Sequence, residues 1–201
     1  MKMTTLDRLL LFIAGLLAAY QIVVGIDALS AAPIIAYTIA FGILLVAGLL
    51  LIILGFEVLD SPIVVIVSTI IPLALSLGLV LEYSASFRIP YLVFALLGFL
   101  AVSVTRSIPT QNGLRTLTIA LVHGVSGVII FLLPIILAVQ GRAHPAFALV
   151  GLGGALIGLD GLLVSLLKTG KPILTRETIL KILPILWLVM TVCFVVGFKF
   201  G

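Results

Sequence analysis

Charged side chains are scarce in this chain. Of its 201 residues, 9% are Asp, Glu, Lys or Arg, 63% are hydrophobic, and the mean hydropathy is +1.48. This composition cannot cover a soluble globule of this size with a solvated surface. It excludes a water-soluble domain and predicts a polytopic integral membrane protein whose first partner is the lipid bilayer.

Reactive and metal-binding groups are also few. The lone cysteine, Cys193, excludes an intramolecular disulfide and any cysteine-based metal or haem-attachment motif. The two histidines, His123 and His144, fall in opposite halves of the membrane, which excludes a bis-histidine haem. Lys181 lies too near the end of its apolar segment to hold retinal. Since a Gly-rich phosphate loop and a nucleophile beside a base are also missing, we expect no enzyme activity, no cofactor and no metal.

Apolar segments fill most of the chain. A helix needs about 20 apolar residues to cross the hydrocarbon layer, and backbone groups in lipid must bond within their own segment. The fold class is therefore all-α, a membrane helical bundle. Short turns with Pro, Gly and polar residues leave no room for a soluble domain, so residues 1–201 are expected to form a single membrane domain. The predicted spans are about 9–26, 31–56, 62–81, 89–105, 116–139, 145–167 and 177–198.

The basic residues predict an orientation. With seven spans, eight of the eleven Lys and Arg residues collect on one side of the membrane, and omitting the fourth, shortest span destroys this segregation. Loops rich in Lys and Arg are cytoplasmic, so we expect the N-terminus inside and the C-terminus outside a cell membrane of the prokaryotic kind. The net charge of +4 then faces lipid head groups, and no nucleic-acid partner is needed to explain it. The eight residues are Lys2, Arg8, Arg106, Arg115, Lys168, Lys171, Arg176 and Lys181.

Small residues form stripes on the fifth and sixth spans, which a short turn joins. Helices associate in lipid where small residues let the backbones approach, so these stripes predict an antiparallel hairpin. The stripe on the sixth span consists of Gly151, Gly154, Gly158 and Gly161, and that on the fifth of Ala120, Gly124 and Gly127.

Two ionisable residues interrupt the same spans. Asp160 lies eight residues from Lys168, and His123 lies eight residues from Arg115. At about 1.5 Å per residue, both side chains are expected about 12 Å from the same end of their helices. A charged Asp at this depth costs about 3 kcal/mol, so it needs a partner, water or a proton. We predict a proton or substrate site at Asp160 and His123; the alternative is a register-fixing hydrogen bond that also uses Ser126 or Ser165.

Three prolines lie inside spans and are expected to kink them: Pro72, Pro134 and Pro184. Pro72 and Pro184 are 112 residues apart, as are Gly42 and Gly154. This offset suggests that spans one to three repeat as spans five to seven in a parallel arrangement, with the fourth span as linker. The plan resembles, in architecture alone, the SWEET sugar transporters and the vitamin transporters of the nicotinamide riboside type, and architecture does not fix function.

Two functions remain open at this point. The first is a small transporter or channel for a small solute or ion, with a protonatable intramembrane site. The second is an accessory or structural subunit of a larger membrane complex, respiratory or photosynthetic, with no activity of its own. Few polar residues inside the spans favour the subunit, since solute paths are usually wetter. The repeat and the buried pair favour transport. A homo-oligomer is compatible with either.

Overall fold

The computed structural model describes residues 2–26, 29–108, 112–168 and 174–200, so Lys171 lies outside the described part. Seven helices in it are long and apolar enough to cross a membrane, and the described residues contain no strand, which confirms the predicted all-helical bundle and is consistent with an integral membrane protein. Their ends differ from the predicted ends by four residues at most. The helices are α1 (Thr5–Val24), α2 (Ala31–Leu54), α3 (Pro62–Tyr83), α4 (Arg88–Ser107), α5 (Asn112–Val139), α6 (Ala148–Lys168) and α7 (Arg176–Lys199).

Helix ends follow from local chemistry. Thr4 and Asp7 form a capping box at the start of α1: Thr4 Oγ1 accepts from the Asp7 N–H at 3.2 Å, and the Asp7 carboxylate accepts from the Thr4 N–H at 2.8 Å. Pro62 occupies the first turn of α3, where its missing N–H costs nothing. Gly25 and Gly55 end α1 and α2 with φ of 71° and 75°, a left-handed conformation that favours glycine. Short 3₁₀ turns precede three of the helices: η1 (Phe56–Asp60), η2 (Ala85–Phe87) and η3 (Pro145–Phe147).

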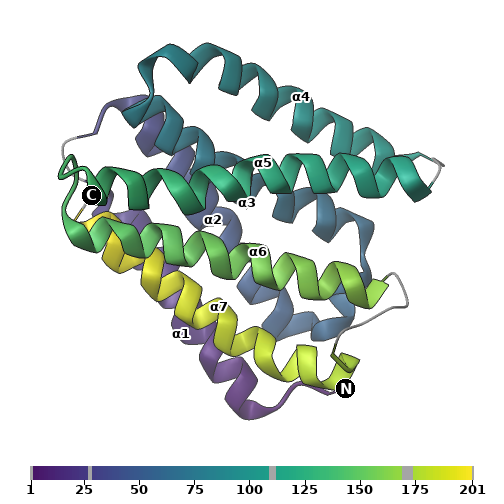
Figure 1. The fold of residues 1–201 in the computed structure, drawn as a ribbon. Coiled ribbons are helices and arrows are strands. Elements are labelled where there is room, and N and C mark those ends of the chain that lie inside the picture. The colour runs from purple at the N-terminus through teal and green to yellow at the C-terminus, as the bar shows by residue number, and fades with distance from the viewer. Residues whose placement is uncertain (1, 27–28, 109–111, 169–173, 201) are drawn as a thin grey trace.

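Six of the helices form a closed ring. Neighbours around it are α1, α2, α3, α5, α6 and α7, and α7 returns to α1. Helix α4 packs outside this ring against α3 and α5 (Figure 1). The two termini lie at opposite ends of the bundle. We call the end where α1, α3, α5 and α7 begin the N-face, and the opposite end the C-face.

The largest cluster of buried side chains lies toward the C-face. Its aromatic rings join α2, α3, η3 and α7, with Tyr37 and Phe198 centred 4.6 Å apart and Tyr83 and Phe147 5.4 Å apart. Gly78 admits the Tyr37 ring, because a Cβ at that glycine would lie 2.4 Å from a ring carbon. This end of the bundle is therefore closed by interlocking rings.

Toward the N-face the core divides. One smaller cluster joins α1, α2, η1 and α7 around Leu11 and Leu183, and another joins α3, α4 and α5 around Val102 and Val122. No described residue of α6 belongs to either cluster. Residues 62–68 of α3 are exposed or half-buried, in contrast to its buried second half. The described apolar side chains of the N-face half thus pack in two separate clusters.

Helices α3, α4 and α5 are joined by a buried polar contact. The Tyr91 hydroxyl on α4 lies 2.7 Å from Ser76 Oγ on α3 and 3.3 Å from Ser126 Oγ on α5. Ser76 in turn donates to the carbonyl of Pro72 at 2.5 Å. These bonds satisfy the hydroxyl groups that burial would otherwise leave without water, and they occupy Ser126, which the sequence offered as a partner for Asp160.

Candidate functional site between α5 and α6

The glycine stripe of α6 meets α5 only over its first part. A Cβ at Gly151 would lie 2.5 Å from the Phe131 carbonyl oxygen, and one at Gly154 would lie 2.6 Å from Ile130 Cγ2. The backbone and side chains of α5 therefore pack directly against the α-carbons of these two glycines. The hairpin is tightly packed here, toward the C-face, by the mechanism that small residues allow in lipid.

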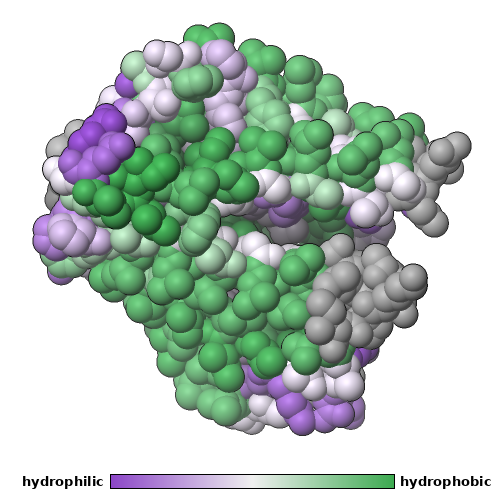
Figure 2. Space-filling view, in the orientation of Figure 1, coloured by the Kyte–Doolittle hydropathy of each residue, from purple (hydrophilic) through white to green (hydrophobic). Residues whose placement is uncertain are grey.

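The same two helices separate toward the N-face. Gly158 and Gly161 on α6, and Gly124 and Gly127 on α5, have no described atom within 4 Å of the position of a Cβ. Ala120 is exposed as well. Figure 2 shows the resulting hollow between α5 and α6, with hydrophilic atoms visible inside it. The close approach expected at these five positions is thus not present, and we call the open space the vestibule.

Asp160 lies on α6 at the level of the vestibule. The residue is half-buried, and its Oδ1 atom is fully buried with no hydrogen-bond partner in the described part of the chain. Buried polar atoms are almost always paired, and a carboxylate is the costliest of them to leave alone. The side chain of Ser165, another partner suggested by the sequence, lies outside the described part.

His123 lies on α5, two turns from the buried Ile130 and on the same interior stripe. Its Nδ1 is 3.2 Å from the carbonyl oxygen of Ile119. The structure therefore brings His123 and Asp160 to one end of neighbouring helices, and no hydrogen bond or ion pair between them occurs among the described residues.

Arg115 organises the N-face rim of α5. Its Nε donates to the carbonyl of Thr105 and its Nη2 to that of Ile108, both at 3.1 Å. These acceptors belong to the end of α4, where carbonyl groups lack helical partners and favour a cation. Arg115 thereby holds α4 against the start of α5, beside the mouth of the vestibule.

The predicted kink prolines lie inside their helices: Pro72 in α3, Pro134 in α5 and Pro184 in α7, all buried.

The described residues contain no group of three His, Cys, Asp or Glu side chains that could hold a metal ion. Among the described side chains, the Asp160 carboxylate and the His123 imidazole are the ionisable groups that the sequence predicted for this site.

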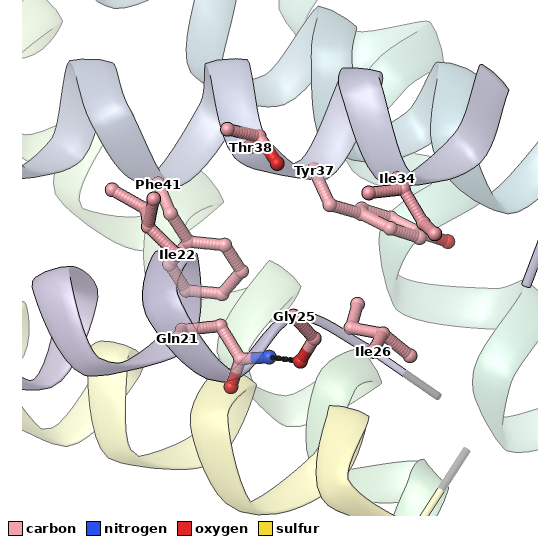
Figure 3. A pocket seen from close by; sticks show the side chains of 8 residues that line it. All are labelled: Gln21, Ile22, Gly25, Ile26, Ile34, Tyr37, Thr38 and Phe41. Atoms are coloured by element: carbon pink, nitrogen blue, oxygen red, sulfur yellow. Dashed lines mark hydrogen bonds between the residues drawn. The ribbon is translucent and has the colours of Figure 1, made fainter. Parts of the chain in front are cut away.

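A separate pocket lies between α1 and α2 toward the C-face (Figure 3). Its lining is mostly apolar, with Ile22, Ile26, Ile34 and Phe41 around it. Gln21 contributes an amide, but that amide already donates to the Gly25 carbonyl at 2.7 Å and completes the end of α1. Tyr37 and Thr38 also line the pocket, and the buried Tyr37 hydroxyl has no hydrogen-bond partner among the described residues.

Comparison with known proteins identifies no relative: no family model, no curated protein and no solved structure matches the chain.

Proposed function

We propose that this chain is a membrane transport protein that moves a small cation, protons included, through the vestibule between α5 and α6. The observation that carries the proposal is the buried, unpartnered Oδ1 of Asp160 beside helices that stand apart. Ionisable residues inside membrane spans are rare and commonly mark ion pathways or proton relays, which makes an unpartnered carboxylate a candidate functional group. The proposed orientation follows the basic residues and places the N-face, where the vestibule opens, in the cytoplasm.

The similar arrangement of the two halves of the ring supports a transport mechanism in which the vestibule alternates between an open and a closed state. The order of neighbours is unchanged when α1, α2 and α3 are exchanged with α5, α6 and α7, as a parallel repeat requires. The offset of 112 matches Asp160 with Gly48 and His123 with Leu11. A Cβ at Gly48 would lie 3.9 Å from the Leu11 carbonyl oxygen, so the first hairpin is closed at the level where the second is open.

This asymmetry identifies the moving part of the proposed transporter. Glycine costs about 1 kcal/mol relative to alanine inside a helix, yet a Cβ at Gly124, Gly127, Gly158 or Gly161 would meet no described atom within 4 Å. Their use is explained if α5 and α6 close onto each other in a second state, as α1 and α2 already do. Closure would bring His123 toward Asp160 and shut the vestibule.

The function is tested by reconstituting the purified chain into liposomes that contain a trapped pH-sensitive dye. A potassium gradient with valinomycin then sets the inside negative. We expect proton influx well above that of protein-free liposomes, because a buried titratable carboxylate at the level of the vestibule gives protons a binding site partway across the membrane. Influx equal to that of the empty liposomes would contradict proton transport by this chain.

An accessory subunit is the second candidate, and the position of α4 favours it. This helix stands outside the ring, and Leu96, Leu97 and Leu100 on it are 58–63% exposed. Lipid or a partner helix would cover such a face equally well. Native electrophoresis after mild detergent extraction separates the candidates: a subunit runs with a large set of other proteins, whereas a transporter runs alone or as a small homo-oligomer.

A further inference from the structure

The register of α6 and α7 identifies the residue of α7 that lies at the level of Asp160. A Cβ at Gly197 would lie 2.6 Å from Val150, and a Cβ at Gly153 would lie 2.7 Å from the Phe194 ring. Moving three residues forward along α6, from 150 to 153, thus corresponds to moving three residues back along α7, from 197 to 194, as in an antiparallel pair of helices. Seven further residues return each helix to nearly the same face, so this register puts Asp160 on the side of α6 that faces α7, at the level of Trp187.

Trp187 is suited to more than packing. It is the chain's one tryptophan, it is half-buried, and it lies at the edge of both the large cluster and the N-face cluster of α1, α2 and α7. Tryptophan is the aromatic side chain that attracts cations best, and quaternary ammonium groups are bound in this way. A carboxylate opposite an indole supplies both the charge and the apolar face that such a group needs.

We infer that Asp160 and Trp187 form a binding site for a small organic ammonium ion that enters through the vestibule. This inference rests on the proposed function and specifies its substrate class. The buried Oδ1 of Asp160, which has no hydrogen-bond partner, is the atom that the ammonium group would neutralise. His123 lies on the opposite wall, on α5, where closure of α5 onto α6 would cover the bound ion.

Choline and its uncharged isostere 3,3-dimethyl-1-butanol test this site in the full chain purified in detergent. Because Trp187 is the single tryptophan, intrinsic emission reports on the site directly. We expect choline to change the emission saturably, and the alcohol to have at least tenfold weaker effect. Equal responses to the two compounds, or no saturable response to choline, would overturn the inference.

Three variants make the test specific for the Asp160 charge. Asp160→Asn is expected to weaken choline binding at least tenfold, whereas Asp160→Glu, which keeps the charge, should stay within tenfold of the unmodified chain. Glu57→Gln removes an exposed carboxylate from η1 at the same end of the bundle and should leave binding unchanged. Thermal melting shows whether each variant is folded. Undiminished choline binding by folded Asp160→Asn would exclude the site.

The outcome is separable from that of the transport proposal. Proton influx that depends on Asp160, together with no choline response, would reject the organic cation and leave transport in place. Choline binding that depends on Asp160, without proton or choline flux in liposomes, would establish the site and reject transport.

Discussion

Replacing Asp160 with asparagine is expected to lower proton influx into liposomes at least tenfold. The amide has nearly the same size and shape as the carboxyl group, but it neither carries a negative charge nor releases a proton. The change therefore removes the chemistry of the site while leaving the packing of α6 in place. The initial rate at which the liposome interior acidifies under a fixed potassium diffusion potential, reported by the trapped dye, measures the effect.

The matched controls for this prediction are carboxylates away from the vestibule. Glu57→Gln at the N-face and Glu82→Gln near the end of α3 should retain the full rate, since neither side chain lies on α5 or α6. His123→Ala is expected to reduce influx as well, because the imidazole lines the opposite wall. An Asp160→Asn protein that is folded and transports at the unmodified rate would show that the carboxylate has no part in transport.

Replacing Gly151 with alanine is the second change with a large expected effect, and it acts on stability. The added Cβ would lie 2.5 Å from the carbonyl oxygen of Phe131 and 2.8 Å from Ile135, so α5 and α6 must move apart. Overpacking of this kind costs about 1–3 kcal/mol. We expect a lower melting temperature and a lower denaturant midpoint in detergent.

Gly158→Ala is the control for that substitution, on the same helix and with the same chemical change. Nothing described lies within 4 Å of the new methyl group, and alanine favours a helix over glycine by about 1 kcal/mol. The variant should be as stable as the unmodified chain or more so, while closure of the vestibule, and with it flux, should be impaired. Equal losses of stability at Gly151 and Gly158 would contradict the open geometry.

The helices were predictable from the sequence because two strong signals agree. Lipid demands long apolar helices, and residues such as Pro62 and Gly55 mark where a helix begins or ends. Even the short fourth span is a full helix of 20 residues, Arg88–Ser107. These are local properties of the chain, and they need no knowledge of how the helices pack.

The site was less accessible to sequence reasoning, since it depends on how each helix is rotated and tilted. Counting residues placed Asp160 and His123 at one depth, but a spacing along two helices does not show whether the side chains meet. Apolar residues in lipid do not mark a buried face, because lipid-facing positions are apolar too. The inferred pairing of Asp160 with Trp187 required the register of α6 and α7, which the contacts at Gly153 and Gly197 supply.

The glycine stripes show the same limit. Gly154 and Gly158 form one small-residue pattern in the sequence, yet one touches Ile130 and the other faces open space. The pattern records where helices are able to approach, and it does not distinguish a permanent contact from one made in a second state. The tilt between α5 and α6, set by the packing of the whole ring, decides which glycines are in contact.

The most direct test of the account is whether water reaches the vestibule from the N-face. In a Cys193→Ala background, Gly161→Cys places a thiol in the open space, and Leu162→Cys places one at nearly the same depth on an exposed apolar face. We predict that a charged, membrane-impermeant thiol reagent modifies the cysteine at 161 from the N-face side and leaves the one at 162 unmodified. Protection of both positions from that side, in a folded protein, would contradict the vestibule and the transport function built on it.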